Sequence, residues 1–508
     1  MSHSIEITPI DHRTPLLRQA TKDEIEEEKK VDHLIEKKET NGQDQVNKSA
    51  NKIIDEIYED LDMNSAMKST TIFKVSVGLR ESNPDAYKPK VISIGPYHKH
   101  NPELRSMEKY KLRYLQRFLR RKEGIDVESC IRELEDEALN CYDDIENLDS
   151  DIVGKFSKLL LLDGCFLVEF IRERYGIYPE EEGWIIPGNC ISNQVRRDLL
   201  LVENQLPFFV LTKLHHMTMD DEDEIPFTTM VKWIFLPSLP KMTPASFNES
   251  EGNAAEIKHL LQVVHMSCHP SEIKTTSLTN PSMETEHSWK SLCCNPLQII
   301  RSKDKPIDKD HLTGHNVMPN ATELSEAGVS FVKVGYIYNK LRKENYGDNT
   351  SLFDIKFENG LMRIPSFNVT DSTETLLRNL IAYEQQSSHV RPRYFSDFAI
   401  FMDYLIDSER DVNLLRHKGI IRNRIGEDKE IASLFNKIGK GVIVSSENFY
   451  YKEECRKLVQ HYEQPWNLMK ASLRRNYFSS PWVGASTVAA VILLILTAMQ
   501  TVLAFTDD

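Results

Sequence analysis

Residues 159–170 read LLLLDGCFLVEF, and residues 196–211 read RRDLLLVENQLPFFVL. The first run lies at the centre of a predicted helix over 153–175 that is largely buried. The second run predicts an apolar helix over 193–217, which Pro207 should kink or restart. A helix that is apolar on every face belongs in a protein interior. The two runs therefore predict the core of a mainly helical domain.

Both apolar runs also carry polar side chains, namely Asp163, Glu169, Arg196, Arg197, Asp198, Glu203, Asn204 and Gln205. An unpaired buried carboxylate is costly, so these groups predict a salt-bridged network between packed helices. In that network Arg196 or Arg197 is expected to neutralise Glu203. The alternative is a catalytic pair, in which Asp163 or Glu169 works with Glu203 as acid and base in a cleft.

Two other positions offer reactive groups. Gly95-Pro96-Tyr97-His98 closes a predicted strand over 91–97 and places a phenol and an imidazole at a tight turn, where functional groups are common. The alternative there is a packed tyrosine and a solvated histidine. Cys165 is expected to be a small buried residue and not a nucleophile, because no basic residue is near it in sequence.

Histidine and cysteine gather between residues 265 and 294, at His265, Cys268, His269, His287, Cys293 and Cys294. Their types suit zinc, but they form neither a CxxC pair nor a regular histidine pair, so no metal site is expected. The sequence has no phosphate-binding loop, dinucleotide fingerprint, HExxH or Gly-x-Ser-x-Gly. We assign no catalytic residue, cofactor or metal.

The flanking segments complete a mainly α fold with small β elements. Residues 102–121 predict a helix whose basic face, Lys109, Arg113, Arg117, Arg120 and Arg121, should be solvated, and residues 131–148 predict another. Alternating runs joined at Asn359-Gly360 predict a β-hairpin near 352–369. Asp371 and Glu374 resemble a capping box at the start of the next helix. Further helices are expected near 395–417, 427–440 and 448–478.

Charge and composition along the chain predict its division into domains. The 508 residues carry 63 Lys and Arg against 77 Asp and Glu, a net charge of −14 that disfavours general nucleic-acid binding. Residues 1–70 are expected to be an acidic, mobile leader. A globular domain over 71–478 follows, with a low-complexity insertion near 268–318.

Residues 482–505 contain no charge and would reach about 36 Å as a helix, enough to cross a bilayer. Lys470, Arg474 and Arg475 precede this run and only Thr506, Asp507 and Asp508 follow it, which favours a cytosolic N-terminal bulk and a tail anchor. The N-terminus has no signal-peptide pattern. Topology can be tested at five glycosylation sequons, at Asn47, Asn248, Asn320, Asn349 and Asn368.

Seven motifs together resemble the plant family called domain of unknown function 247. They are ISIGPYHKHNPELRSMEKYK (92–111), LLLLDGCFLVEF (159–170), RRDLLLVENQLPFFVL (196–211), NATELSEAGVSF (320–331), FDIKFENGLMRIPSFNVTDSTETLLRNLIAYEQ (353–385), DVNLLRHKGIIRN (411–423) and YFSSPWVGASTVAAVILLILTAMQT (477–501). The resemblance covers about 71–505 and implies one family domain with a C-terminal membrane anchor. Some members have been linked to self-incompatibility in grasses, which implies recognition or signalling. The resemblance supplies no catalytic residue.

These observations predict a membrane-anchored plant protein that acts through interaction or signalling and not through catalysis. Its expected partners are a plasma membrane or endomembrane, reached through 482–505, and unidentified proteins, but not nucleic acid. The alternative is a membrane-tethered enzyme that uses the buried carboxylates.

Overall fold

Two compact units divide the chain, Met1–Ser69 and Thr70–Asp508, and all residues described below belong to the second. The computed structural model describes residues 70–122, 124, 126–143, 148–178, 183–219, 225–235, 257–270, 318–334, 351–477 and 481–506. The predicted leader, apart from its last residue, and nearly all of the predicted insertion lie outside this part of the chain. Both remain expectations.

Helices dominate the described residues, as the sequence predicts. Their bounds in the first half are α2 Val77–Arg80, η1 Pro84–Tyr87, η2 Pro102–Met107, α3 Glu108–Arg121, α4 Val127–Leu139, α5 Ser150–Val153, α6 Phe156–Tyr175, α7 Asn189–Asp198, α8 Phe208–Met217, α9 Phe227–Phe235 and α10 Leu260–Met266. Those in the second half are α11 Ala321–Glu326, α12 Thr373–Gln386, α13 Tyr394–Leu405, α14 Glu409–His417, α15 Asp428–Ile438, α16 Lys452–Tyr462, α17 Pro465–Tyr477 and α18 Pro481–Thr506.

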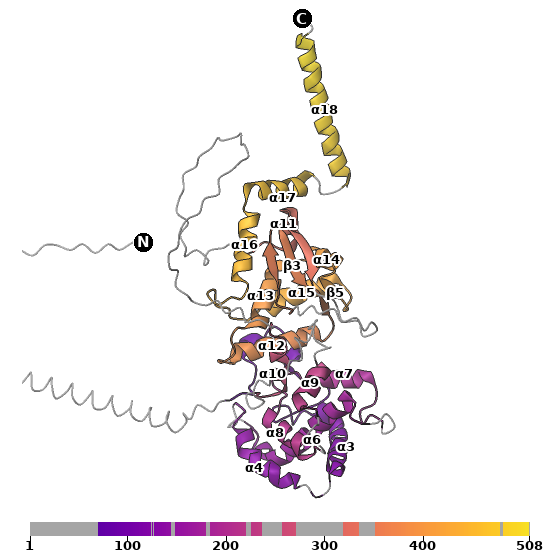
Figure 1. Cartoon of the computed structure of the whole chain (residues 1–508), viewed down its shortest axis with the longest axis vertical. Helices are drawn as coiled ribbons and strands as arrows, with labels where there is room; N and C mark the ends of the chain where they lie inside the picture. Colours follow the sequence, from indigo (N-terminus) through magenta and orange to yellow (C-terminus); the bar gives the residue numbers. More distant parts are fainter. Residues whose placement is uncertain are drawn as a thin grey trace, which may run out of the picture. The chain divides into compact units, whose positions relative to one another are not determined.

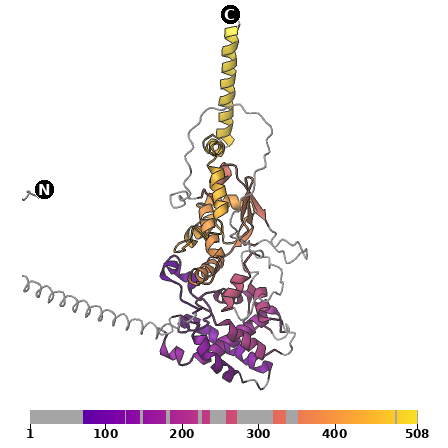
Figure 2. The same ribbon diagram turned by 60° about the vertical axis from the view of Figure 1, so that its left-hand side comes forward.

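Helix α6 is the centre of the first half. Helices α3, α4, α8 and α9 pack around it, and both ribbon views show these helices gathered together (Figure 1, Figure 2). Fourteen of its residues are buried, including Phe166, Phe170 and Cys165, so α6 is the largely buried helix that its sequence predicts. Burial of each large apolar side chain contributes about 1.5–3 kcal/mol.

The helix predicted over 193–217 is two helices. Helix α7 ends at Asp198 and α8 begins after Pro207, which serves as its N-cap residue. Proline has no amide hydrogen to donate and fits the start of a helix, so the restart at Pro207 follows from its chemistry.

Two small sheets lie in the second half. In the first, β3 (Leu361–Pro365) pairs parallel with β1 (Ser330–Val334) and antiparallel with β2 (Lys356–Glu358). The second pairs β4 (Phe367–Val369) parallel with β5 (Ile421–Asn423). The predicted hairpin is formed by β2 and β3, and its turn residues Asn359 and Gly360 have positive φ of 51° and 76°, as a type I′ turn requires.

Two predicted helix starts are wrong. Helix α4 covers Val127–Leu139 and not 131–148, because the Asp126 side chain accepts the Ser129 amide and caps the helix earlier. Helix α12 follows Ser372 without a side-chain cap, so the predicted capping box is not formed. Glu374 instead accepts hydrogen bonds from Arg378 and Asn83, at 2.8 Å each.

Candidate functional site

The segment predicted as a strand over 91–97 is an irregular stretch whose backbone is bound by side chains. The Asp198 carboxylate accepts the amides of Lys90, Val91 and Ile92 at 2.7–3.1 Å. Asn204 then accepts the Ile94 amide at 2.7 Å and donates to the Ile92 carbonyl oxygen at 3.1 Å. These side chains provide the donors and acceptors that a neighbouring strand would otherwise provide. The strand prediction is wrong for that reason.

Asp163 on α6 holds the end of this segment. Its carboxylate accepts the Lys111 ammonium at 2.6 Å and the Gly95 amide at 3.0 Å, and both charged side chains are fully buried. Burial raises the pKa of Asp163, although Lys111 opposes the shift. Gly95 has a φ of +70°, and a Cβ atom there would lie 2.7 Å from the Gln205 carbonyl oxygen. Only glycine fits this contact.

The three consecutive polar residues after α7 each hold a different segment. Glu203 accepts the Val75 amide at 2.6 Å, Asn204 holds 92–94 as above, and Gln205 accepts the Leu261 amide of α10 at 3.1 Å. This explains why a polar stretch interrupts the apolar sequence. The side chains replace regular secondary structure as the connection between distant segments.

The expected partner of Glu203 is wrong. Glu203 pairs with Arg80 and lies 3.4 Å from Nε2 of His98. Arg197 pairs with Asp198 at 2.7 Å, and Arg196 donates to Asn193. Arg80 lies 123 residues from Glu203 in sequence, so no local pattern could identify it.

Glu169, the third acid of the catalytic alternative, pairs with Arg172 at 3.0 Å and accepts the Tyr178 hydroxyl. Asp163, Glu169 and Glu203 thus have separate partners among the described residues and do not share one cleft. The Tyr97 hydroxyl donates to the carbonyl oxygens of Ile72 and Asp143, at 3.1 and 2.8 Å. Cys165 is fully buried, and burial raises the pKa of its thiol, as its expected structural role requires.

Lys111 is a buried partner that the apolar runs do not indicate, and the prediction that Arg117 is solvated is wrong. Arg117 pairs with Glu173 at 2.6 Å, and the Tyr114 hydroxyl donates to the same carboxylate at 2.7 Å. A signal for Lys111 was present, because Met107, Lys111, Tyr114 and Phe118 follow helical spacing along one buried face. A lysine on an apolar stripe predicts a buried ion pair.

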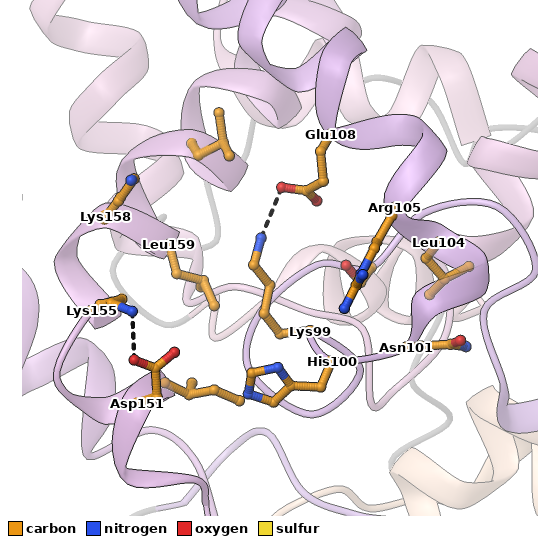
Figure 3. Close-up of a pocket in the computed structure, with 13 residues that line it drawn as sticks. Lys99, His100, Asn101, Leu104, Arg105, Glu108, Asp151, Lys155, Lys158 and Leu159 are labelled. Carbon is orange, nitrogen blue, oxygen red and sulfur yellow. Dashed lines mark hydrogen bonds and ion pairs between the residues drawn. The ribbon is translucent and has the colours of Figure 1, made fainter.

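A pocket of about 360 Å³ opens beside this network (Figure 3). Its lining comes from η2 and the turn before it, from α3, and from α5 and the start of α6. The charged and polar lining residues are Ser93, Lys99, His100, Asn101, Arg105, Glu108, Asp151, Lys155 and Lys158. Lys111, just behind the wall, donates to the Ser93 carbonyl oxygen at 2.6 Å. The buried Lys111 to Asp163 pair therefore supports the pocket wall.

Cations outnumber acids in the pocket. Lys99 pairs with Glu108 at 2.9 Å, and Lys155 pairs with Asp151 (Figure 3). Arg105 and Lys158 are exposed and have no ion-pair or hydrogen-bond partner for their charged groups in the described part of the chain. Four cationic side chains thus face two carboxylates, and two charges remain for an anion.

Both pocket acids are held in the ionised form. Burial acts to raise the pKa of Glu108, but Lys111 and Lys99 outweigh it and lower that pKa below its ordinary value. The hydrogen bond from Lys155 lowers the pKa of Asp151. A carboxyl group that donates a proton near neutral pH needs a raised pKa, so these two acids suit ion pairing better than acid catalysis.

Of the described histidines between residues 265 and 294, His265 is buried in the core and His269 is half-buried. His265 pairs with Glu384 at 2.9 Å, and its ring is 4.8 Å from that of His269. The Cys268 thiol donates to the Val264 carbonyl oxygen at 3.0 Å. No group of three or more potential ligands is placed to hold a metal in the described residues, while His287, Cys293 and Cys294 lie outside them.

Comparison with known proteins identifies the family. A model described as a plant protein of unknown function, DUF247, matches residues 72–496. UPF0481 protein At3g47200 of Arabidopsis thaliana is 27% identical over 448 residues, which cover 86% of each chain. Putative UPF0481 protein At3g02645 of the same plant is 25% identical over 494 residues, covering 85% of this chain and 89% of that protein. No solved structure matches the chain. The chain belongs to the DUF247 family of plant proteins of unknown function.

Proposed function

We propose that this chain is a single-pass membrane protein whose helical domain acts in the cytosol as a binding module for interaction or signalling, without catalysis. Helix α18 carries the proposal. Its segment Trp482–Val502 has a mean hydropathy of 2.1, and none of it is buried in the described structure. At 1.5 Å per residue these 21 residues reach about 31 Å, the thickness of a hydrocarbon core.

The charges beside α18 support a cytosolic domain. Lys470, Arg474 and Arg475 lie on α17, immediately before the span, and α17 contains no acidic residue. Basic residues next to a span stay on the cytosolic side. Two of the five sequons lie in described secondary structure: the Asn320 Oδ1 accepts the Glu323 amide at the start of α11, and Asn368 lies in β4.

The basic pocket is the proposed binding site, and its ligand class is a small anion with two or more phosphate or carboxylate groups. Arg105 and Lys158 supply the uncompensated charges, while Lys99 and Lys155 can exchange a carboxylate partner for the ligand. The volume of about 360 Å³ suits a small molecule and excludes a folded domain.

The anchoring is tested by removal of residues 481–508. We expect the full chain to resist carbonate extraction and the truncated chain to become soluble, because the span is the main source of membrane affinity. A truncated chain that still resists carbonate would overturn the role of α18. Endoglycosidase treatment tests orientation separately, since a mobility shift of the full chain would place the domain in the lumen.

The binding site is tested with pyrophosphate and inositol hexakisphosphate, by calorimetric titration of the full-length protein in nanodiscs. We expect binding that weakens with added salt and is lost in the Arg105→Ala/Lys158→Ala variant. The matched control is Arg120→Ala/Lys213→Ala, which removes two exposed cations outside the pocket. Equal binding by both variants would overturn the site. The source of the ligand is distinguished by comparing a phosphatidylinositol phosphate with its soluble headgroup. Equal affinity for the two would identify a free ligand, and binding of the lipid alone would identify a membrane ligand.

A further inference from the structure

Helix α17, directly before the span, has an exposed apolar stripe. Trp466, Met469, Leu473 and Tyr477 are 65%, 44%, 42% and 50% exposed. At about 100° per residue these four side chains fall within roughly 80° of one another around the helix. A stripe with an exposed tryptophan is unusual on a surface that faces only water, because apolar area of this extent marks an interaction site.

A different side of α17 is fixed to the domain. Asn467 is buried and donates to the His461 carbonyl oxygen at 2.7 Å, while Arg474 donates to the Ser325 carbonyl oxygen at 2.9 Å. Helix α17 also packs against α11. These contacts fix the rotation of α17 about its own axis. The stripe is therefore held in an exposed position and does not pack on the domain.

The occupant of the stripe follows from chain connectivity and charge. Four peptide steps join Tyr477 to Pro481, which limits their separation to about 14 Å. If α18 enters a bilayer at Trp482, the end of α17 must therefore lie near the headgroups. Helix α17 carries Lys470, Arg474 and Arg475 and no acidic residue, and this net positive charge complements an anionic leaflet.

We propose that α17 is an interfacial helix that inserts its stripe, Trp466, Met469, Leu473 and Tyr477, into the anionic leaflet that α18 enters. This inference rests on the proposed anchoring. Tryptophan and tyrosine favour the boundary between headgroups and acyl chains, and amphipathic helices lie in that plane. Because α17 is also bound to α11, its insertion would fix the height and tilt of the whole domain above the membrane.

The test uses full-length protein in phosphatidylcholine vesicles, with or without phosphatidylserine, and lipids with brominated acyl chains. Bromine quenches tryptophan fluorescence at short range, and the signals of single tryptophans come from comparison with Trp466→Phe, Trp482→Phe and Trp184→Phe. We expect the lipid-dependent quenching to fall in Trp466→Phe and in Trp482→Phe but not in Trp184→Phe. Trp184 is an exposed tryptophan remote in sequence from the span.

The outcomes separate this inference from the anchoring. Quenching that falls in Trp482→Phe but not in Trp466→Phe would overturn the interfacial helix and leave the span intact. Quenching that changes in neither variant would overturn both. Shielding of Trp466 from aqueous iodide without quenching by lipid would also overturn the proposal, because a second copy or another protein would then cover the stripe.

Charge is tested in the same vesicles. We expect phosphatidylserine to increase the quenching of Trp466, and Lys470→Gln/Arg475→Gln to abolish that increase while quenching of Trp482 persists. The control Lys452→Gln/Lys457→Gln removes two cations from α16 and should leave the increase unchanged. Quenching of Trp466 that is independent of phosphatidylserine in the unaltered protein would overturn the anionic requirement.

Discussion

Helices α6 and α18 are both long and apolar, yet they occupy different surroundings. Helix α6 is buried in the core and carries Asp163, Glu169, Arg172 and Glu173, which all have partners. Helix α18 carries no charge and is not buried. If α18 spans a membrane, as proposed above, hydrophobicity alone does not separate a core helix from a membrane span. Internal charges do, because a protein interior can provide partners that a bilayer does not.

The largest expected effect on stability is at Lys111. Lys111→Met should lower the free energy of unfolding by about 3–5 kcal/mol, because it leaves the fully buried Asp163 carboxylate without its cation. Chemical denaturation of the full-length protein in nanodiscs measures this loss.

The matched variant is Lys111→Met/Asp163→Asn. It removes both charges and keeps an oxygen that can accept the Gly95 amide. Recovery of much of the lost stability is expected, since replacement of a whole buried pair costs far less than removal of one partner. If the single and double variants are equally destabilised, the ion pair is not the reason for the loss.

The second change places a charge in α18. Leu494→Arg should make insertion less favourable by about 2.5–3.5 kcal/mol, because arginine at the centre of a span has no partner in lipid. A carbonate-resistant fraction that decreases relative to Leu494→Ala would show this effect. An unchanged fraction would mean that α18 does not cross the hydrocarbon core.

The third change tests whether Glu203 has a structural role. Glu203→Gln should lower the free energy of unfolding by about 1–3 kcal/mol. The loss is smaller than for Lys111 because the side chain of its partner Arg80 is 29% exposed and retains some hydration. Glu128→Gln, in an exposed pair with Arg132, is the control and should leave the melting temperature unchanged. A raised melting temperature for Glu203→Gln would contradict the structural role and favour the enzyme alternative.

Local patterns predicted much of the fold. Apolar runs located α6 and α8, and Asn359-Gly360 located the hairpin, because these signals depend on neighbouring residues. The strand over 91–97 failed because its acceptors are Asp198 and Asn204, about a hundred residues away in sequence. Its alternation predicted a strand, and nothing local in the sequence indicated that distant side chains would bind this backbone instead.

The candidate site was less predictable than the fold. The buried acids could be located because each interrupts an apolar run, and Lys111 could have been found in the same way. Arg105 and Lys158 could not, because an exposed cation has no characteristic sequence pattern and the pocket brings together η2 and α6. Partner choice at Glu203 depends on the folded chain and not on spacing.

The smallest effect concerns two buried titratable side chains, His259 and Asp397. Burial, with a contribution from His265, lowers the pKa of His259 from 6.5 to about 3. Between these values the unfolded chain binds a proton that the folded chain does not, so stability falls as pH decreases, by at most about 1.4 kcal/mol per pH unit.

Burial raises the pKa of Asp397 from 3.8 to about 7. This shift has the opposite effect on stability, because protonation of the folded state adds stability as pH falls through that range. Acidification from about pH 7 to about pH 5 should therefore destabilise His259→Asn less, and Asp397→Asn more, than the unaltered protein, as the change in melting temperature measures. Asparagine at position 259 keeps an acceptor for the Gln262 amide, which His259 caps at 3.2 Å, so the helix cap is retained. Identical pH dependence in all three proteins would show that neither group is buried in the ionisation state assigned here.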